Sequence, residues 1–102
     1  MTDIGRQHKA LVSRVRDGDG HASRELRRAA FDYAGLEEPL RGLVDKVAHQ
    51  AHTVNDDDVA AARAVGFSED QIFEIVICAA VGQATRLYER GIAALEAATE
   101  GR

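Results

Sequence analysis

The chain is poor in the residues on which several common chemistries of small proteins depend. Its 102 residues include one cysteine, one proline and no tryptophan. A lone cysteine closes no internal disulfide and supplies neither a C-x-x-C redox pair nor a thiolate zinc site. The longest unbroken apolar run, residues 75–81, is far shorter than the roughly 20 residues of a membrane span, and the charged start of the chain does not resemble a secretory signal. We therefore expect a cytoplasmic protein without a membrane segment.

Charged residues of both signs are present, but they are unevenly placed. Residues 1–34 carry seven basic and five acidic side chains, whereas residues 35–102 carry six and twelve. The arginines of the first part alternate with acidic residues and no aromatic platform is interleaved with them, so we expect no nucleic-acid partner. A chain of this length buries only about two thirds of the surface that its open form exposes. We therefore expect one domain, residues 1–102, that gains part of its stability from self-association.

Apolar residues recur at intervals of three and four along most of the chain, which predicts an all-helical bundle of about five helices. The first two helices lie within residues 1–35. Ser23 is expected to cap the second helix, which directs Tyr33 inward and ends with Gly35 in a left-handed conformation. The third helix begins at Pro39, in its first turn, and ends near Thr53.

The starts of the fourth and fifth helices are defined by their caps. Asn55 caps the fourth helix, and the carboxylates of residues 56–58 lie at the positive end of its dipole, so we interpret them as capping residues rather than as a cation site. Ser68 and Gln71 form a capping box that begins the fifth helix.

No proline interrupts the chain from Glu69 to about Ala98, so a single helix of roughly 45 Å is expected. In its first half, residues 72–81, apolar residues occupy almost every face of the helix. This half must be buried on all sides by other helices or by another subunit, and the pattern therefore predicts a homo-oligomer.

A candidate site lies on the third helix, on the face away from its apolar stripe. Asp45, His49 and His52 fall within a sector of about 60° on a helical projection. A carboxylate four residues before an imidazole can orient the ring for acid or base catalysis. The alternative is a solvated face with two stray histidines. The H-x-x-H spacing lacks the other parts of a metal signature, so no metal and no cofactor are expected.

Other polar residues add to the candidates. Glu74 is the single carboxylate in the most apolar stretch, and it either reaches water from the helix start or is buried against an arginine or histidine. Arg41 and Arg86 are candidate anchors for an anion, although the pattern favours a solvated face for Arg86. Cys78 is expected to be a packed core thiol.

Residues 40–44 and 64–76, LRGLV and AVGFSEDQIFEIV, resemble the carboxymuconolactone decarboxylase and alkylhydroperoxidase D family. The resemblance covers a little over half of the chain, with residues 36–102 as the family-like core, and its most specific part is the run GFSEDQIFEIV before an alanine-rich helix. It implies an all-helical subunit that assembles into trimers or hexamers.

The chain departs from the peroxidase branch of that family. Those members carry C-x-x-C and then a histidine ahead of the glycine, and counting back from Gly66 places Ala51, Val54 and Asp58 there. Thiol peroxidase activity is therefore not expected. Members without the cysteine pair act on lactones or related small acids by proton transfer. His49 and His52 are the imidazoles nearest to the usual site region, although neither matches a defined family motif.

Two hypotheses follow. In the first, the protein performs acid or base chemistry on a small carboxylate or lactone, with His49 as base or acid, Asp45 as its orienter and His52 and Glu74 as secondary candidates. In the second, it is a non-catalytic homo-oligomeric binding or assembly protein. An apolar pocket that contains the histidines favours the first, whereas histidines in water or in isolated contacts favour the second.

Overall fold

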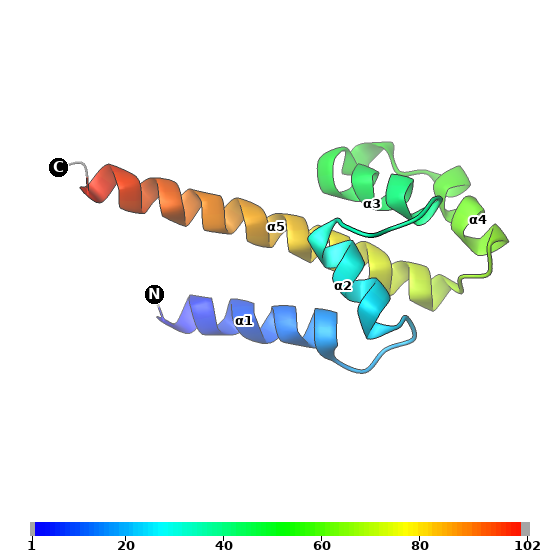
Figure 1. Cartoon of the computed structure of the whole chain (residues 1–102), viewed down its shortest axis with the longest axis horizontal. Coiled ribbons are helices and arrows are strands. Elements are labelled where there is room, and N and C mark those ends of the chain that lie inside the picture. The colour runs from blue at the N-terminus through cyan, green and yellow to red at the C-terminus, as the bar shows by residue number, and fades with distance from the viewer. Residues whose placement is uncertain (1, 101–102) are drawn as a thin grey trace.

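The computed structural model describes the backbone of residues 2–100 and the side chains of residues 5–100. This part of the chain contains five α-helices, one 3-10 turn and no strand. They are α1 (Thr2–Asp17), α2 (Arg24–Asp32), α3 (Leu40–His49), η1 (Ala51–Thr53), α4 (Asp56–Ala64) and α5 (Glu69–Glu100). The other four helices contact α5, which runs the length of the molecule (Figure 1). The all-helical, single-domain prediction is confirmed. Within residues 2–100, no helix has the length and apolar character needed to cross a membrane.

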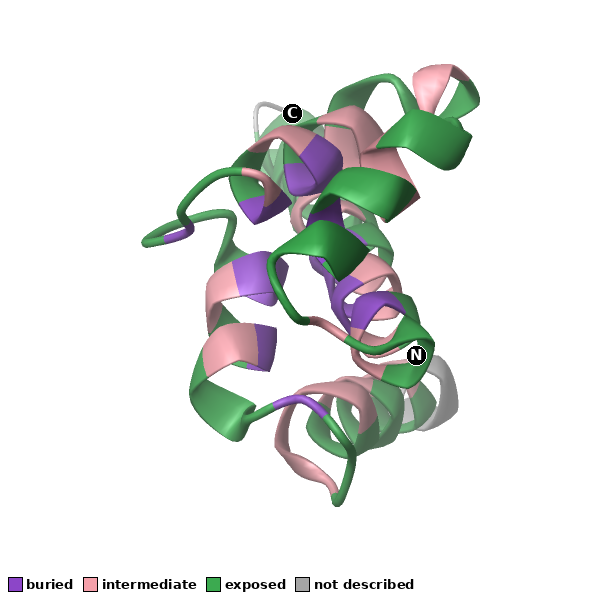
Figure 2. Ribbon diagram, turned by 90° about the vertical axis from the view of Figure 1, so that its right-hand side faces the viewer, coloured by how far each residue is buried: buried purple, intermediate pink, exposed green. Residues whose placement is uncertain are grey.

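The core lies where α2 and α3 meet the first half of α5. Leu43, Val44, Ile75 and Cys78 are its largest fully buried side chains. Figure 2 shows the buried segments gathered on the sides of the ribbons that face one another. The core thus occupies one end of the molecule, and the second half of α5 extends beyond it (Figure 1).

The C-terminal end of α2 rests directly on α5. A Cβ atom at Gly82 would overlap the backbone carbonyl of Phe31, so only glycine allows this close approach. Arg86, one turn further along α5, donates from Nη1 to that carbonyl oxygen at 2.6 Å and from Nη2 to Gln83 Oε1 at 3.1 Å. The contact fixes the end of α2 against the middle of α5.

α2 begins as expected but ends earlier than the sequence predicts. The Ser23 side chain accepts a hydrogen bond from the backbone N–H of Leu26 at 3.1 Å. The helix closes at Asp32, and its cap residue is Tyr33, with φ of 52°. Gly35 is left-handed as expected, with φ of 75°, but it lies two residues beyond the cap. Tyr33 therefore points outward, with 38% of its surface exposed, and the inward position predicted for it is wrong.

α3 also ends before its predicted limit. Gln50 leaves the helical conformation, with φ of −147°, and the chain continues in the short turn η1. Ala51 and His52 are exposed in this turn rather than continuing the helix to Thr53. The face that was predicted to carry His52 therefore ends at His49.

The predicted caps of α4 and α5 are confirmed. Asn55 accepts the backbone N–H groups of Asp57 and Asp58, and the Asp58 carboxylate accepts the N–H of Asn55. Ser68 and Gln71 exchange the two hydrogen bonds of a capping box, at 2.9 and 3.1 Å. α5 then continues as one helix of 32 residues.

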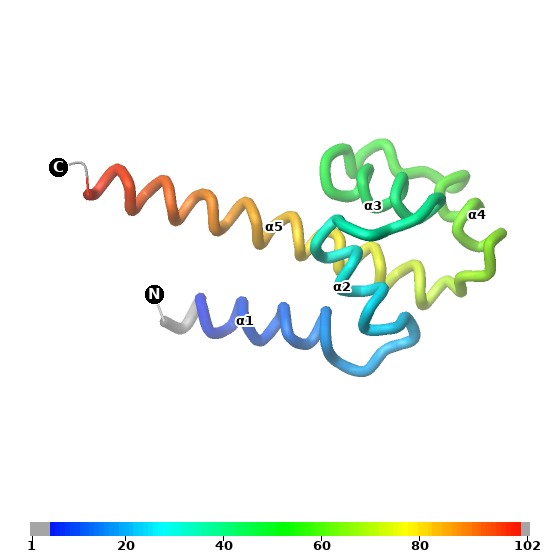
Figure 3. Tube along the Cα trace, viewed as in Figure 1, coloured from blue at the N-terminus to red at the C-terminus, as the bar shows by residue number. Residues whose placement is uncertain are grey.

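α1 is held against the other helices by buried polar contacts. Arg27 of α2 is 3% exposed and donates from its two terminal nitrogens to the carbonyl oxygens of Val15 and Gly18, which end α1. Further along α1, His8 Nε2 lies 2.9 Å from Thr85 Oγ1, and the His8 ring stacks on Tyr88. α1 therefore lies beside α5, so that both ends of the chain are found at the same end of the molecule (Figure 3).

The chain itself covers most, but not all, of the apolar half of α5. Ile72, Ile75, Cys78 and Ala79 are buried, and Val76, Ile77 and Val81 are half-buried. Phe73, which is 64% exposed, and Ala80 are the exposed residues of this half. Cover on every side, as expected from the sequence, would need a second molecule.

Candidate functional site

The candidate pair on α3 is joined by a tyrosine from the end of α2. Asp45 accepts a hydrogen bond from the Tyr33 hydroxyl at 2.6 Å. His49 Nδ1 lies 3.2 Å from the same carboxylate oxygen and 3.3 Å from the backbone carbonyl oxygen of Asp45. Both neighbours of Nδ1 are acceptors, so Nδ1 is the donor in this arrangement, and in the neutral ring Nε2 is then the acceptor. The Tyr33 and His49 rings meet edge to face, with centroids 5.5 Å apart.

The two helices place this group through their own geometry. Arg41, Asp45 and His49 are spaced four residues apart, so their side chains share one face of α3 over about 12 Å. Tyr33 reaches this face because its left-handed cap conformation turns the side chain away from the core. We call Tyr33, Asp45 and His49 the α2–α3 polar group.

Hydrogen bonding within the polar group sets the charge of its members. The bond donated by Tyr33 lowers the pKa of Asp45, and the His49 ring lowers it further, so Asp45 is a carboxylate at neutral pH. The same bond raises the pKa of Tyr33, because the neutral hydroxyl is the donor. The group can orient an imidazole, and it lies open to water, with about half of the Asp45 and His49 side chains exposed.

Arg41 lies close to this group. Together with Tyr33 and residues 34–36 it lines a surface hollow of about 340 Å³. Its guanidinium currently donates to the Glu38 carboxylate at 3.1 Å in an exposed ion pair. Exposed pairs of this kind contribute little free energy, so a ligand carboxylate can compete for Arg41.

The other predicted site residues lie elsewhere. His52 is exposed in η1 and has no hydrogen bond or ion pair within residues 5–100. Arg86 is engaged with the end of α2 through Phe31 and Gln83. The structure therefore brings Asp45, His49 and Arg41 onto one face but places His52 and Arg86 away from it.

Glu74 belongs to a different part of the molecule. Its carboxylate accepts the backbone N–H groups of His21 and Ala22, at 2.8 to 3.1 Å, and contacts the His21 ring at 3.0 Å. Its side chain is 21% exposed. The sequence left two interpretations of Glu74, access to water or burial against an arginine or histidine. Each holds in part, because Glu74 is half-buried and paired with a histidine. It fixes the loop between α1 and α2 in place.

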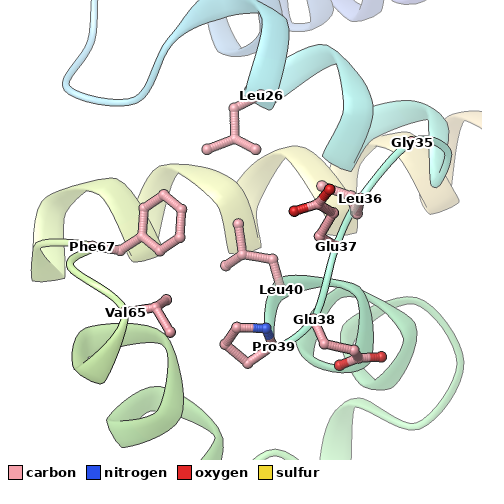
Figure 4. Close-up of a pocket in the computed structure, with 9 residues that line it drawn as sticks. All are labelled: Leu26, Gly35, Leu36, Glu37, Glu38, Pro39, Leu40, Val65 and Phe67. Carbon is pink, nitrogen blue, oxygen red and sulfur yellow. The ribbon is translucent and has the colours of Figure 1, made fainter.

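A second hollow, which shares Gly35 and Leu36 with the first, has no histidine in its lining. Its volume is about 400 Å³, and Figure 4 shows Leu26, Leu40, Val65 and Phe67 around it, with two glutamates and a proline beside them. Tyr33, Asp45 and His49 are not among the residues that line this hollow.

The side chains of residues 5–100 include no group of three or more potential ligands that could hold a metal ion. Asp58, in the acidic run of α4, pairs with Lys46 Nζ at 2.9 Å and completes the capping box. Capping and this ion pair account for its position.

Two residues of these sites could not be found from the sequence. Tyr33 was assigned to the core because it follows the apolar period of α2, and its outward position depends on where that helix stops. His21 follows a glycine-rich corner and joins Glu74 across 53 residues of sequence. No local sequence pattern identifies Tyr33 or His21 as a partner of these carboxylates.

Comparison with known proteins adds no further information on the site. No family model matches the chain, and neither a curated protein nor a solved structure matches it.

Proposed function

We propose that the protein is a non-catalytic helical assembly protein, which forms homo-oligomers on a scaffold like that of the carboxymuconolactone decarboxylase family and lacks thiol peroxidase activity. One observation carries this proposal. The second half of α5 is amphipathic, but its large apolar side chains are in water: Leu87 is 54% exposed and Leu95 is 65% exposed.

The apolar side of an isolated subunit's helix normally faces its own core. Phe73, in the first half of α5, is 64% exposed as well, so the uncovered apolar surface extends along most of the helix. Monomeric proteins seldom expose contiguous apolar surface beyond a few hundred Å². Self-association, which the family resemblance also implies, would supply the missing cover.

Sedimentation velocity tests this proposal. We expect the wild-type protein to sediment as an oligomer at about 100 µM, and Leu87→Glu to shift it to the monomer because a charge on this surface cannot be buried without a partner. Ala97→Glu is the matched control, since Ala97 is exposed on another side of the same helix. A wild-type protein that is monomeric at this concentration would refute the proposal.

A second candidate function is favoured by the polar group. Asp45 holds His49 through Nδ1, and Arg41, which lines a hollow with Tyr33 on the same face of α3, would bind a ligand carboxylate. In such a reaction, Nε2 would take a proton from the carbon beside a lactone or carboxylate carbonyl. The C–H bonding pair would then move onto the carbonyl system, and Asp45 would stabilise the imidazolium.

NMR titration separates this candidate from the assembly role. Small lactones and carboxylates should shift the His49 ring signals, and the shifts of neighbouring residues should disappear in His49→Ala. His52→Ala is the control because His52 lies outside the polar group. If His49→Ala binds each compound as well as the wild type does, the acid–base role is refuted.

A further inference from the structure

The exposed apolar residues of α5 form one continuous stripe. Each helical residue turns by 100°, so side chains spaced alternately by four and three residues share a face. We define the outer stripe of α5 as the following residues: Phe73, Ile77, Ala80, Ala84, Leu87, Gly91 and Leu95. It is about 33 Å long at 1.5 Å per residue and contains no charged side chain.

The stripe lies on the side of α5 that is opposite to the core. Ile75, Cys78 and Gly82, which are buried, lie more than 100° away from the stripe axis on a helical projection. In the second half of the helix, Glu89 and Glu96 continue the direction of the buried side. The apolar side of this half therefore points away from the helices of its own chain, except at its edge, where Tyr88 stacks on the His8 ring of α1.

The stripe has a size suited to a protein partner. Phe73, Leu87 and Leu95 are between 54% and 65% exposed, Ile77 is half-buried, and Tyr88 and Ile92 at the edge of the stripe are about 40% exposed. Together they offer on the order of several hundred Å² of apolar surface, which approaches the roughly 800 Å² that each partner contributes to a standard interface. We therefore expect an association that is reversible and depends on concentration.

A membrane surface is a poorer match than a protein. Helices that lie on membranes carry mainly lysine and arginine on their polar side. The second half of α5 carries Arg86 and Arg90 but also Glu89, Glu96 and Glu100, so its charge is negative overall. Anionic lipid would repel this helix rather than bind it.

The stripe is partly complementary to its own reverse. When two copies of α5 are placed antiparallel with Ala84 opposite Ala84, two small residues meet at the centre, and Ile77 faces Gly91, so a bulky residue meets the smallest one. Towards the ends Phe73 faces Leu95, and Ala80 and Leu87 face Tyr88 and Val81 of the other copy. In a parallel pair, Gly91 would face Gly91 and leave a void, whereas Phe73 would face Phe73.

We infer that the outer stripe of α5 binds the same stripe of a second copy of this chain, with the two helices antiparallel about a two-fold axis at Ala84. Two-fold dimers of this kind are the commonest form of self-association. The inference rests on the proposed assembly function and specifies its partner and geometry.

Disulfide cross-linking tests the geometry separately from the assembly itself. Ala84→Cys should form a linked dimer in oxidised glutathione, because the two-fold axis brings both copies of residue 84 within disulfide range. Leu95→Cys should not link to itself, because its two copies would lie about 33 Å apart. A mixture of Leu95→Cys and Phe73→Cys should give the mixed dimer. The wild type, with only the buried Cys78, is the control.

The outcomes distinguish the two claims. Linking of Ala84→Cys without self-linking of Leu95→Cys supports the antiparallel pair. Self-linking of Leu95→Cys, or an oligomer in which Ala84→Cys fails to link, refutes the pair but leaves the assembly function standing. A protein that is monomeric at about 100 µM refutes both, and so does a monomer that binds phospholipid vesicles through Leu87. Circular dichroism of each variant checks that the helices are intact.

Discussion

Cys78 is fully buried in the core, and its thiol donates to the carbonyl oxygen of Val15 at 3.4 Å. Burial raises the pKa of Cys78 to about 11. At pH 8 this lowers the thiolate fraction by about a hundredfold relative to an ordinary cysteine. We therefore predict that iodoacetamide alkylates the folded protein at least a hundredfold more slowly than the protein in urea, as measured by mass spectrometry. Equal rates would show that Cys78 is accessible.

Glu74 makes stability depend on pH. Partial burial raises the pKa of Glu74, but the hydrogen bonds from His21 and Ala22 outweigh this effect and lower it. Because the pKa is lower in the folded state, the carboxylate stabilises the fold above about pH 4.5, the value for an unperturbed glutamate. This stabilisation is lost as the pH falls through the folded-state pKa.

We predict that Glu74→Gln lowers the free energy of unfolding by about 1–3 kcal/mol at pH 7, since it removes a charged acceptor of backbone N–H groups. The difference from the wild type should shrink below pH 4.5. Urea unfolding followed by circular dichroism measures both values. Glu89→Gln is the control, because Glu89 is exposed and has no hydrogen bond in the described part of the chain. A difference that stays constant with pH would contradict the assigned role.

Single residues differed in how far the sequence could place them. Asp45 and His49 were correctly placed together because both lie on one helix, where spacing alone determines the shared face. Tyr33 and His21 were not, because each depends on a contact between separate elements. The polar group could thus be predicted only in the part that lies within α3.

Among the helices, the contact between α2 and α5 depends most strongly on one position. Gly82→Ala would place a Cβ atom against the Phe31 carbonyl, and backbone atoms cannot move aside easily. We predict a loss of stability of about 1–3 kcal/mol, as is typical of overpacking. Gly5→Ala in α1 is the control, because nothing lies within 4 Å of its Cβ position. Thermal unfolding of both variants measures the effect, and equal melting temperatures would refute this account of the α2–α5 contact.

The helix starts were predicted better than the helix ends. The caps of α2, α4 and α5 depend on residues within three positions of one another, so the local sequence was sufficient. The ends of α2 and α3 are set partly by longer-range contacts. Arg86 binds the last turn of α2, and the ion pair between Lys46 and Asp58 ties α3 to α4. No periodic pattern contains this information.

At the scale of the whole molecule, the helical periodicity was sufficient to predict the fold class but not the cover of α5. The run of residues 72–81 indicated burial on all sides, but this chain leaves Phe73 and Ala80 of the run exposed. The hydropathy of the sequence indicates that this helix surface is buried, but it does not indicate whether the same chain or another molecule buries it. The exposed residues of α5 are therefore the surface through which the stability of one chain depends on a second chain.

This dependence predicts that stability rises with protein concentration. If only folded chains pair through α5, mass action stabilises the fold as the dimer becomes populated. Each kcal/mol gained raises the melting temperature by about 4–8 °C in a domain of this size. We expect a rise of several degrees between about 1 and 100 µM for the wild type, and none for Leu87→Glu, which should melt at the temperature of the monomer. Differential scanning fluorimetry at both concentrations measures this, and identical wild-type curves would show that α5 is stable without a partner.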